Sequence, residues 1–240
     1  MEKIRLNKYL AEGGTCSRRE ADQWISAGRV RKNGVRAALG ETVGAEDIIT
    51  VDGNPVLPVE TLVYLAFHKP VGVEVTMDPS AKKGLTSVLS TPWRVFPVGR
   101  LDKDSSGLLL LTNDGDIVNR ILRPEHAHEK EYLVHIDGAV TPAFLRRMGE
   151  GLTLEGGERT RTCHVTAQNP HAFRIVLTEG KHRQIRRMAA SLGVKVTAIK
   201  RVRILQIRLG KLPRGAWRLL NKKEVRALKD DLGYRPRARQ

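Results

Sequence analysis

The first sixty residues carry apolar positions at helical spacing and then at strand spacing. Leu6, Tyr9 and Leu10 share one helical face, and Gly13 is placed to end that helix. A second helix is predicted to begin after Ser17, because a serine followed three residues later by a glutamate is typical of a capping box. The apolar stripe of this second helix is formed by Ala21, Trp24 and Ile25.

A small sheet is predicted to follow the two helices. Residues 29–32 and 35–37 flank the pair Asn33-Gly34, which is typical of a type I′ hairpin turn. Residues 48–51 predict a further strand. The segment 1–58 is therefore expected to form a domain of its own, and the proline-containing residues 53–61 are expected to link it to the rest of the chain.

The chain from 62 to 232 predicts a second domain with many strands and few helices. Strands are expected at 62–67, 95–98, 108–111, 130–136, 159–167, 173–177, 194–203 and 205–209. Helices are expected at 117–122, 141–148, 179–193 and 221–232. The fold class is therefore α+β, and residues 233–240 are expected to form a basic tail that is disordered without a partner.

One polar loop stands directly before the most apolar of these strands. Leu108–Leu111 are four consecutive leucines, bounded by Gly107 and by an Asn-Asp-Gly turn signal, and they predict a strand buried on both faces. The preceding loop begins at Gly99 and carries Asp102, together with Asp104 and several basic and hydroxyl residues. An aspartate in such a loop most often only caps a turn. A loop fixed by a buried strand is also typical of an active site.

The charge balance points to a polyanionic partner. The 240 residues contain 42 Lys or Arg and 26 Asp or Glu, which gives a net charge of +16 and favours nucleic acid over a membrane surface. Between Lys181 and Arg218 there are 12 basic residues and no acidic one. The absence of an 18-residue apolar run and of a signal-peptide pattern predicts a cytoplasmic protein without a membrane association.

Three other chemistries are disfavoured. His126, His128 and Glu129 lie close together in a polar connection but lack further ligands at suitable spacing, so no metal site is predicted. The two cysteines form no CxxC pair, so neither a disulfide framework nor a thiolate metal site is predicted. No Walker or GxGxxG motif is present, so nucleotide cofactors have no support. Asp102 and Asp104 are too close in sequence to be assumed to flank one bond as a glycosidase pair.

Several motifs together resemble a known enzyme family. GRLDKDSSGLLLLTNDGD, starting at Gly99, is similar to the catalytic motif of the RsuA-type pseudouridine synthases, a group that includes RluB, RluE and RluF. Three further motifs of that family are resembled by HKPVG at 68–72, EKEYLV at 129–134 and RQIRRM at 183–188. The sequence around Asp102 and Tyr132 is most similar to that of the RluF subgroup. Residues 5–34 resemble the S4 RNA-binding domain. The tail is shorter than the basic extension associated with that subgroup.

The resemblance implies a fold, a site and a substrate. It implies a mixed, mainly antiparallel sheet with flanking helices for residues 62–232, and it makes Asp102 the catalytic carboxylate, Tyr132 a residue that stacks on the target base, and Arg186 a residue that pairs with Asp102. It implies pseudouridine formation in ribosomal RNA, in the 23S RNA of the large subunit, by a monomer that needs no cofactor. The residues expected to bind RNA are Arg5, Arg18, Arg19, Lys32, Arg100, Lys130, Arg183 and Arg187.

A second function from another class stays open on the sequence alone. A non-catalytic S4-type RNA-binding or ribosome-assembly factor would also need the basic residues. It would have no use for Asp102, Tyr132 and Arg186 together. Formation of pseudouridine in ribosomal RNA would separate the enzyme from the binding factor.

Overall fold

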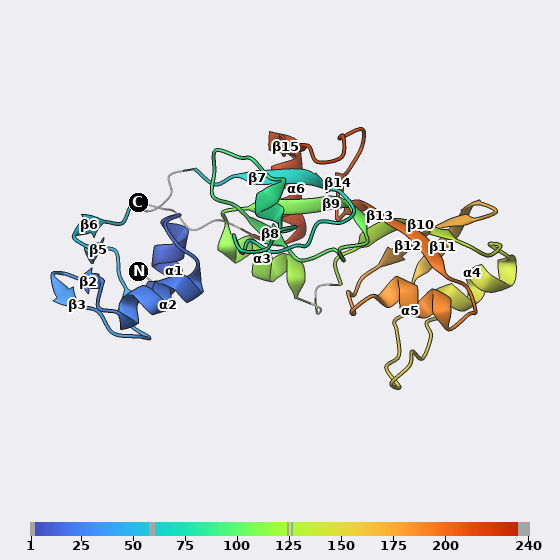
Figure 1. Cartoon of the computed structure of the whole chain (residues 1–240), viewed down its shortest axis with the longest axis horizontal. Coiled ribbons are helices and arrows are strands. Elements are labelled where there is room, and N and C mark those ends of the chain that lie inside the picture. Colours follow the sequence, from blue (N-terminus) through green and yellow to red (C-terminus); the bar gives the residue numbers. More distant parts are fainter. Residues whose placement is uncertain (1–2, 58–60, 124, 126, 235–240) are drawn as a thin grey trace. The chain divides into compact units, whose positions relative to one another are not determined.

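A computed structural model describes residues 3–57, 61–123, 125 and 127–234. The described chain divides into two compact units (Figure 1). The first unit contains the described residues up to Val63 together with Asn113–Gly115, and the second contains Tyr64–Thr112 and the described residues from Asp116 onward. The predicted linker residues 58–60 lie outside the described residues, so the boundary predicted near residue 60 stays a prediction.

The first unit begins with the two predicted helices. Helix α1 spans Leu6–Glu12 and helix α2 spans Arg18–Ser26. The capping box of α2 is confirmed, since the Ser17 side chain accepts a hydrogen bond from the Glu20 backbone and the Glu20 carboxylate accepts one from the Ser17 backbone. The helices pack on one another and on the strands through a core that includes Leu6, Leu10, Ala21, Ile25, Val30, Val43 and Ile49.

Short strands complete the first unit. A four-stranded sheet has the order β3 (Val35–Arg36), β2 (Val30–Lys32), β5 (Ile49–Val51) and β6 (Asn54–Pro55), and a separate pair joins β1 (Ile4–Arg5) to β4 (Thr42–Val43). Asn33 and Gly34 have φ angles of 53° and 81°, as a type I′ turn requires. Strand β6 was not predicted, because the prolines of residues 53–61 indicated a linker. Val56 is instead buried in the core and accepts a hydrogen bond from the Tyr9 hydroxyl.

The described strands of the second unit form one nine-stranded sheet. Its main path runs β11-β12-β10-β13-β9-β7-β15, with β14 added to β13 and β8 added to β9. All pairings are antiparallel except that of β13 with β9. The predicted mixed, mainly antiparallel sheet is therefore confirmed. The strands are β7 Tyr64–Lys69, β8 Phe96–Val98, β9 Ser106–Thr112, β10 Lys130–Ile136, β11 His164–Asn169, β12 Ala172–Leu177, β13 Val196–Ile204, β14 Ile207–Arg208 and β15 Trp217–Leu219.

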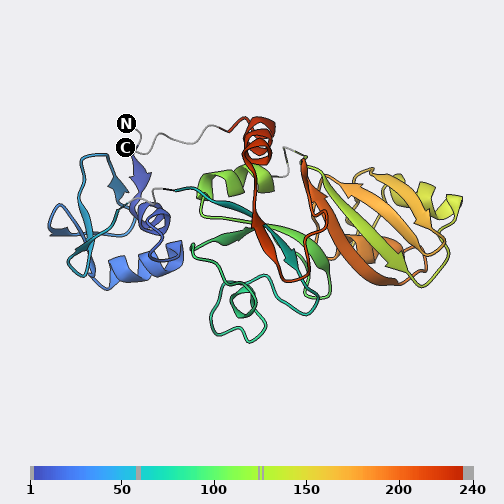
Figure 2. The same cartoon turned by 90° about the horizontal axis from the view of Figure 1, so that it is seen from above.

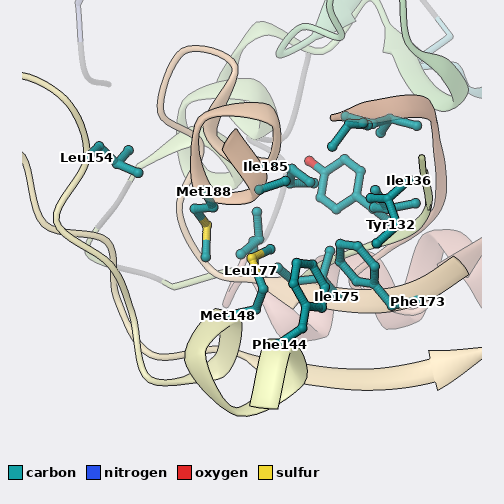
Figure 3. Packing of buried hydrophobic residues seen from close by; sticks show 14 of the residues in the cluster. Tyr132, Ile136, Phe144, Met148, Leu154, Phe173, Ile175, Leu177, Ile185 and Met188 are labelled. Carbon is teal, nitrogen blue, oxygen red and sulfur yellow. The ribbon is translucent and has the colours of Figure 1, made fainter. Parts of the chain in front are cut away.

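Helices cover the sheet of the second unit. Helices α4 and α5 lie against the part of the sheet formed by β10, β11, β12 and β13 (Figures 1 and 2). There Phe144 of α4 meets Phe173 of β12 edge to face, with 5.3 Å between ring centroids. Figure 3 shows this cluster, in which the Tyr132 hydroxyl oxygen lies on the side of Ile185. The helices are α3 Gly115–Leu122, α4 Pro142–Gly149, α5 Gln184–Ala190 and α6 Lys222–Asp231, with one 3₁₀ turn at Leu85–Ser87.

Three predicted segments differ from the observed ones. Helix α5 is shorter than 179–193, because Arg183 has a φ of 50° and cannot belong to a right-handed helix. Residues 159–163 precede β11 as a loop instead of forming its first part. Gly233 and Tyr234 are not a free tail, since Tyr234 is buried and the Arg120 guanidinium lies over its ring. In the part of the chain that the structure describes, no helix is long and apolar enough to span a membrane.

Strand β9 lies in the interior of the sheet, and all seven of its residues are buried. Its first residues form the parallel pairing with β13, where Ser106 lies opposite Lys200 and Gly107 opposite Arg201. The two backbones approach closely at this point. A Cβ atom on Gly107 would lie 2.2 Å from the Arg201 carbonyl oxygen and 2.4 Å from its nitrogen, at a φ of +115°. Only glycine fits there.

We expect Gly107→Ala to lower the free energy of unfolding by about 3 kcal/mol or more, because the added methyl group must push two strands apart and adopt a strained φ. Gly210→Ala is the matched control, since Gly210 also has a positive φ, +58°, but open space around it. Its cost should be only about 1 kcal/mol. Urea denaturation of both variants measures the difference. Equal costs would show that the close approach of β9 and β13 does not constrain residue 107.

Candidate active site

The loop between β8 and β9 carries Asp102 into a large cleft of the second unit. Residues 102–105 form a tight turn, in which the Ser105 backbone donates to the Asp102 carbonyl over 3.1 Å. The cleft has a volume of about 1360 Å³, and Asp102 is one of its lining residues. Within the described residues, the half-buried Asp102 carboxylate accepts no hydrogen bond. It is therefore available to a bound molecule.

Other walls of the cleft come from strands and loops on both sides of the Asp102 loop. Tyr132 and Lys130 reach it from β10, and Ile199 and Arg201 reach it from β13. Tyr132 is only 9% exposed and belongs to the apolar cluster of Figure 3. The structure thus brings two of the three predicted catalytic residues, Asp102 and Tyr132, to one cleft.

Lys69 lies below the Asp102 loop, at the end of β7, and is completely buried. Its ammonium group donates to the carbonyl oxygens of Pro70 and Val73, at 2.9 and 2.6 Å, and more weakly to that of Lys103 at 3.5 Å. Burial lowers the pKa of Lys69 to about 8, against the opposing attraction of Asp102 and Asp104. The predicted HKPVG motif therefore supplies a cation that contacts the residue after Asp102.

Arg201 is a second buried cation at the same loop, and its role was not predicted from the sequence. Its side chain donates to the carbonyl oxygens of Leu108, at 2.7 Å, and Arg100, at 3.3 Å. It thereby fixes the chain two residues before Asp102, while its own backbone pairs with Gly107. The available signal was that Arg201 alternates with Ile199, which is buried on the same strand. It was hidden because the whole surrounding segment is basic.

The third predicted catalytic residue, Arg186, pairs with a different aspartate. Its guanidinium lies 3.1 Å from the Asp104 carboxylate and donates to the Asp104 carbonyl over 3.2 Å and to the Val196 carbonyl over 2.9 Å. The predicted pairing of Arg186 with Asp102 is therefore not observed, and Arg186 does not line the cleft. The reason is geometric, since residues 102–105 turn tightly and direct the Asp104 carboxylate, not that of Asp102, toward α5.

Arg183, at the start of α5, also holds Asp104. Its guanidinium donates two hydrogen bonds to the Asp104 carboxylate, at 3.2 and 3.1 Å. Burial alone would raise the pKa of Asp104, but the hydrogen bond from Arg183 and the charges of Arg186 and Arg183 outweigh it and lower that pKa. Arg183 lines the cleft and is also attracted by Asp102. Among the arginines of RQIRRM, Arg183 thus comes closest to the predicted role of an arginine that pairs with Asp102.

Comparisons with known proteins agree with this geometry. A family model described as RNA pseudouridylate synthase matches residues 63–191, and a model of the S4 domain matches residues 4–49. The chain belongs to the RNA pseudouridine synthase family. It is 46% identical over 92% of its length to the dual-specificity RNA pseudouridine synthase RluF of Salmonella typhi, of which the match covers 77%. It is 38% identical over 97% of its length to ribosomal large subunit pseudouridine synthase B of Vibrio cholerae, of which 76% is covered.

A solved structure supports the same family. A crystal structure of a pseudouridylate synthase superposes with a TM-score of 0.70 at 30% identity, covering 94% of this chain and 99% of the other. The predicted family and fold are thus confirmed. The activity of this family is the isomerisation of uridine to pseudouridine in RNA.

The remaining predicted RNA-binding residues of this pseudouridine synthase unit differ in their availability. Arg100 lines the cleft and is exposed. Lys130 also lines it, but is half-buried, donates to the His128 carbonyl, and has a pKa lowered by burial and by the charge of Arg201. Arg187 is engaged by Glu158 and by the Glu155 carbonyl. His126, which was considered above as a metal ligand and not predicted to be one, lies outside the described residues.

The S4 unit offers three exposed predicted contacts and one that is engaged. Arg5, Arg18 and Arg19 are exposed, and Arg18 donates to the Asn7 side chain. Lys32 instead forms an ion pair with Asp47, at 3.0 Å, and donates to the Thr42 carbonyl. It has less freedom than the others to contact a phosphate.

Lys69 should make stability depend on pH. Its pKa is about 8 in the folded protein and 10.5 in the unfolded chain, so the unfolded state binds more protons between these pH values and stability rises with pH there. Below pH 8 the burial of the charged Lys69 ammonium group lowers the free energy of unfolding by its full amount, roughly 3 kcal/mol. The free energy of unfolding of the wild type relative to Lys69→Met should therefore increase from pH 8 to pH 10.

Urea denaturation at a series of pH values measures this difference. Lys82→Met is the control, since Lys82 is an exposed lysine of the same unit. The wild type and Lys82→Met should differ by the same amount at every pH. A pH-independent difference between the wild type and Lys69→Met would mean that Lys69 is not a buried cation.

Proposed function

We propose that this pseudouridine synthase isomerises a specific uridine of ribosomal RNA, in the large subunit, with Asp102 as the catalytic carboxylate. The observation that carries the assignment of Asp102 is its place in the cleft. Its loop is held by hydrogen bonds to backbone carbonyls, whereas its carboxylate accepts none from the described residues. The large-subunit substrate is supported by the relative named ribosomal large subunit pseudouridine synthase B.

The reaction breaks the bond from ribose C1′ to uracil N1, turns the base and joins C1′ to C5. The C5 proton is lost and N1 gains a proton, so no redox change occurs. The carboxylate can assist by covalent attack or as a general base, and either role requires it to reach the nucleotide directly. Asp102 meets this requirement, because it lines the cleft and no described residue donates a hydrogen bond to its carboxylate.

Tyr132 is proposed to stack on the target base. Its ring belongs to the apolar cluster and also lines the cleft, which places an aromatic side chain beside the position proposed for the target base. A base must leave its stack to reach Asp102, at a cost of a few kcal/mol, and stacking on an aromatic ring offsets part of that cost.

Arg186 is proposed as a positioning residue. It contacts both the carboxylate and the carbonyl of Asp104, two residues after Asp102, and it ties this turn to the Val196 carbonyl on β13. Through these contacts α5 fixes the position of the Asp102 loop in the cleft. This role replaces the direct pair with Asp102 that the sequence predicted.

The first unit is proposed to bind the same RNA as the catalytic unit. The matching S4 model and the exposed Arg5, Arg18 and Arg19 support this role. We further propose that residues 1–58 and 62–232 are separate domains and that the enzyme works in the cytoplasm as a monomer. The alternative of a non-catalytic S4-type binding factor is disfavoured by family membership. Mapping pseudouridines in ribosomal RNA with and without the protein separates the two.

Asp102→Asn should abolish pseudouridine formation, with a loss of at least 10³-fold in the single-turnover rate. The substitution preserves shape and removes only the charge, so the thermal midpoint and the dissociation constant for RNA should stay close to those of the wild type. Release of tritium from C5-labelled uridine in a large-subunit RNA transcript measures the rate. Turnover within tenfold of the wild type would exclude Asp102 as the catalytic residue.

Arg186→Lys should reduce the single-turnover rate at saturating RNA by about tenfold or more while RNA affinity changes little. A lysine cannot make the separate contacts to Asp104 and Val196 that the guanidinium makes. Arg208→Ala is the control, because Arg208 is exposed and lies outside the cleft. If both variants keep wild-type chemistry once RNA is saturating, Arg186 does not position the loop.

A further inference from the structure

The loop between α4 and β11 contributes to the cleft through two arginines that no motif predicted. Residues 151–163 form this loop, which projects beside α5 and is drawn in yellow in Figure 1. Arg159 and Arg161 both line the cleft that contains Asp102, and both are exposed. In the described part of the chain, neither guanidinium has a hydrogen-bond or ion-pair partner.

The loop is held in place against α5 and is not free to move as a flexible arm. Lys181 and Arg187 both bind the Glu158 carboxylate, at 2.7 and 3.1 Å, and Arg187 also donates to the Glu155 carbonyl. The Arg161 backbone donates to the Glu179 carboxylate over 2.9 Å. The position of the two arginines relative to the cleft is therefore set by contacts that do not involve their own side chains.

The backbone of the loop directs both arginines the same way. Thr160, between them, is 4% exposed, and its hydroxyl accepts a hydrogen bond from the Leu152 backbone. Arg159 lies in a bridge opposite Thr153, and the Thr160 backbone donates to the Leu152 carbonyl. Because successive side chains of an extended segment alternate, Arg159 and Arg161 point together, away from the buried Thr160.

Charge distribution separates these arginines from the other cations of the cleft. Lys103 pairs with Glu74, Lys181 with Glu158, and Arg183 with Asp104. The hydrogen bond from Lys181, with that from Arg187, lowers the pKa of Glu158, so this carboxylate beside Arg159 in the sequence stays ionised and is paired with other cations. Glu74, Glu158 and Asp104 are thus paired with other cations, whereas the charges of Arg159 and Arg161 are left for a ligand.

The size of the cleft indicates how much of a ligand it can take. Its volume of about 1360 Å³ exceeds the roughly 300–1,000 Å³ of typical small-molecule sites. The cleft therefore has room for nucleotides next to the target. Arg100 and Arg123, also exposed and without a partner among the described residues, line it as well, at the Asp102 loop and at the end of α3.

We propose that Arg159 and Arg161 form a phosphate clamp for the RNA strand that flanks the target nucleotide. The clamp rests on the proposed function for its ligand, but its contacts are to the backbone and do not depend on which uridine reacts. The contacts of Lys181 and Arg187 with Glu158 hold the clamp in place, so these two basic residues act on RNA through the loop.

The test compares three pairs of substitutions by RNA binding at several salt concentrations. Arg159→Ala with Arg161→Ala removes the clamp, and Arg159→Lys with Arg161→Lys keeps its charge. Arg147→Ala with Arg208→Ala is the control, because it removes two exposed arginines outside the cleft. The probes are a transcript of large-subunit ribosomal RNA and an unrelated RNA of the same length.

The double alanine variant should bind both RNAs about tenfold or more weakly. Its plot of log affinity against log salt should be shallower by about 1.4, since each phosphate contact to a single strand contributes about 0.7. The lysine pair should retain the wild-type slope, and the control pair should reduce it less. An effect on the ribosomal transcript alone would indicate base contacts and overturn the phosphate assignment.

Two further results would also overturn the clamp: a double alanine variant with the slope of the control, or a lysine pair that loses as much as the alanine pair. Circular dichroism shows that each variant is folded. Pseudouridine formation by the wild type on the ribosomal transcript is assayed separately. Its absence would reject the proposed substrate, whereas the salt slopes on both RNAs would still decide the clamp.

Discussion

The geometry of the candidate site depends on donors that hold the backbone of one loop. Arg201 donates to the Arg100 carbonyl, Lys69 to that of Lys103, and Arg186 to that of Asp104. The three cations come from β13, β7 and α5, so elements distant in sequence meet at residues 100–104. Because these contacts bind carbonyl oxygens, they fix Asp102 without occupying its carboxylate. A reactive side chain can be held in place and still be free to react only if the contacts that fix it are made to neighbouring atoms.

Burying these cations is unfavourable, and the structure shows what offsets the cost. Lys69 is desolvated enough to lower its pKa to about 8, yet its ammonium group finds the carbonyl oxygens of Pro70 and Val73 within 2.9 Å. Asp102 and Asp104 add attraction across the loop. The Asp102 carboxylate, which is proposed to react, therefore also stabilises the charged form of Lys69. Neutralising Asp102 removes part of that attraction, which is why the Asp102→Asn variant needs its stability measured beside its rate.

The sequence predicted local structure well and contacts between distant segments poorly. The capping box at Ser17, the Asn33-Gly34 turn and the buried leucine strand each depend on a few adjacent residues, and each is observed. The partner of Arg186 depended on which way a four-residue turn directs two aspartates, and no pattern encodes that. Arg201 was missed for a related reason. Its burial follows from the parallel contact of β13 with Gly107, which is a property of the sheet and not of the segment.

Basic residues in this chain divide between those that build the site and those left for a ligand. Between Lys181 and Arg218 the sequence has no acidic residue, and this one-sidedness suggested a surface made of phosphate contacts. In the structure, Arg183, Arg186 and Arg187 are paired with acids from other segments, Asp104 and Glu158. The unpaired arginines Arg159 and Arg161 lie in a loop outside that stretch. Net charge therefore identifies the class of partner, whereas the pairing of each cation decides which residues can meet it.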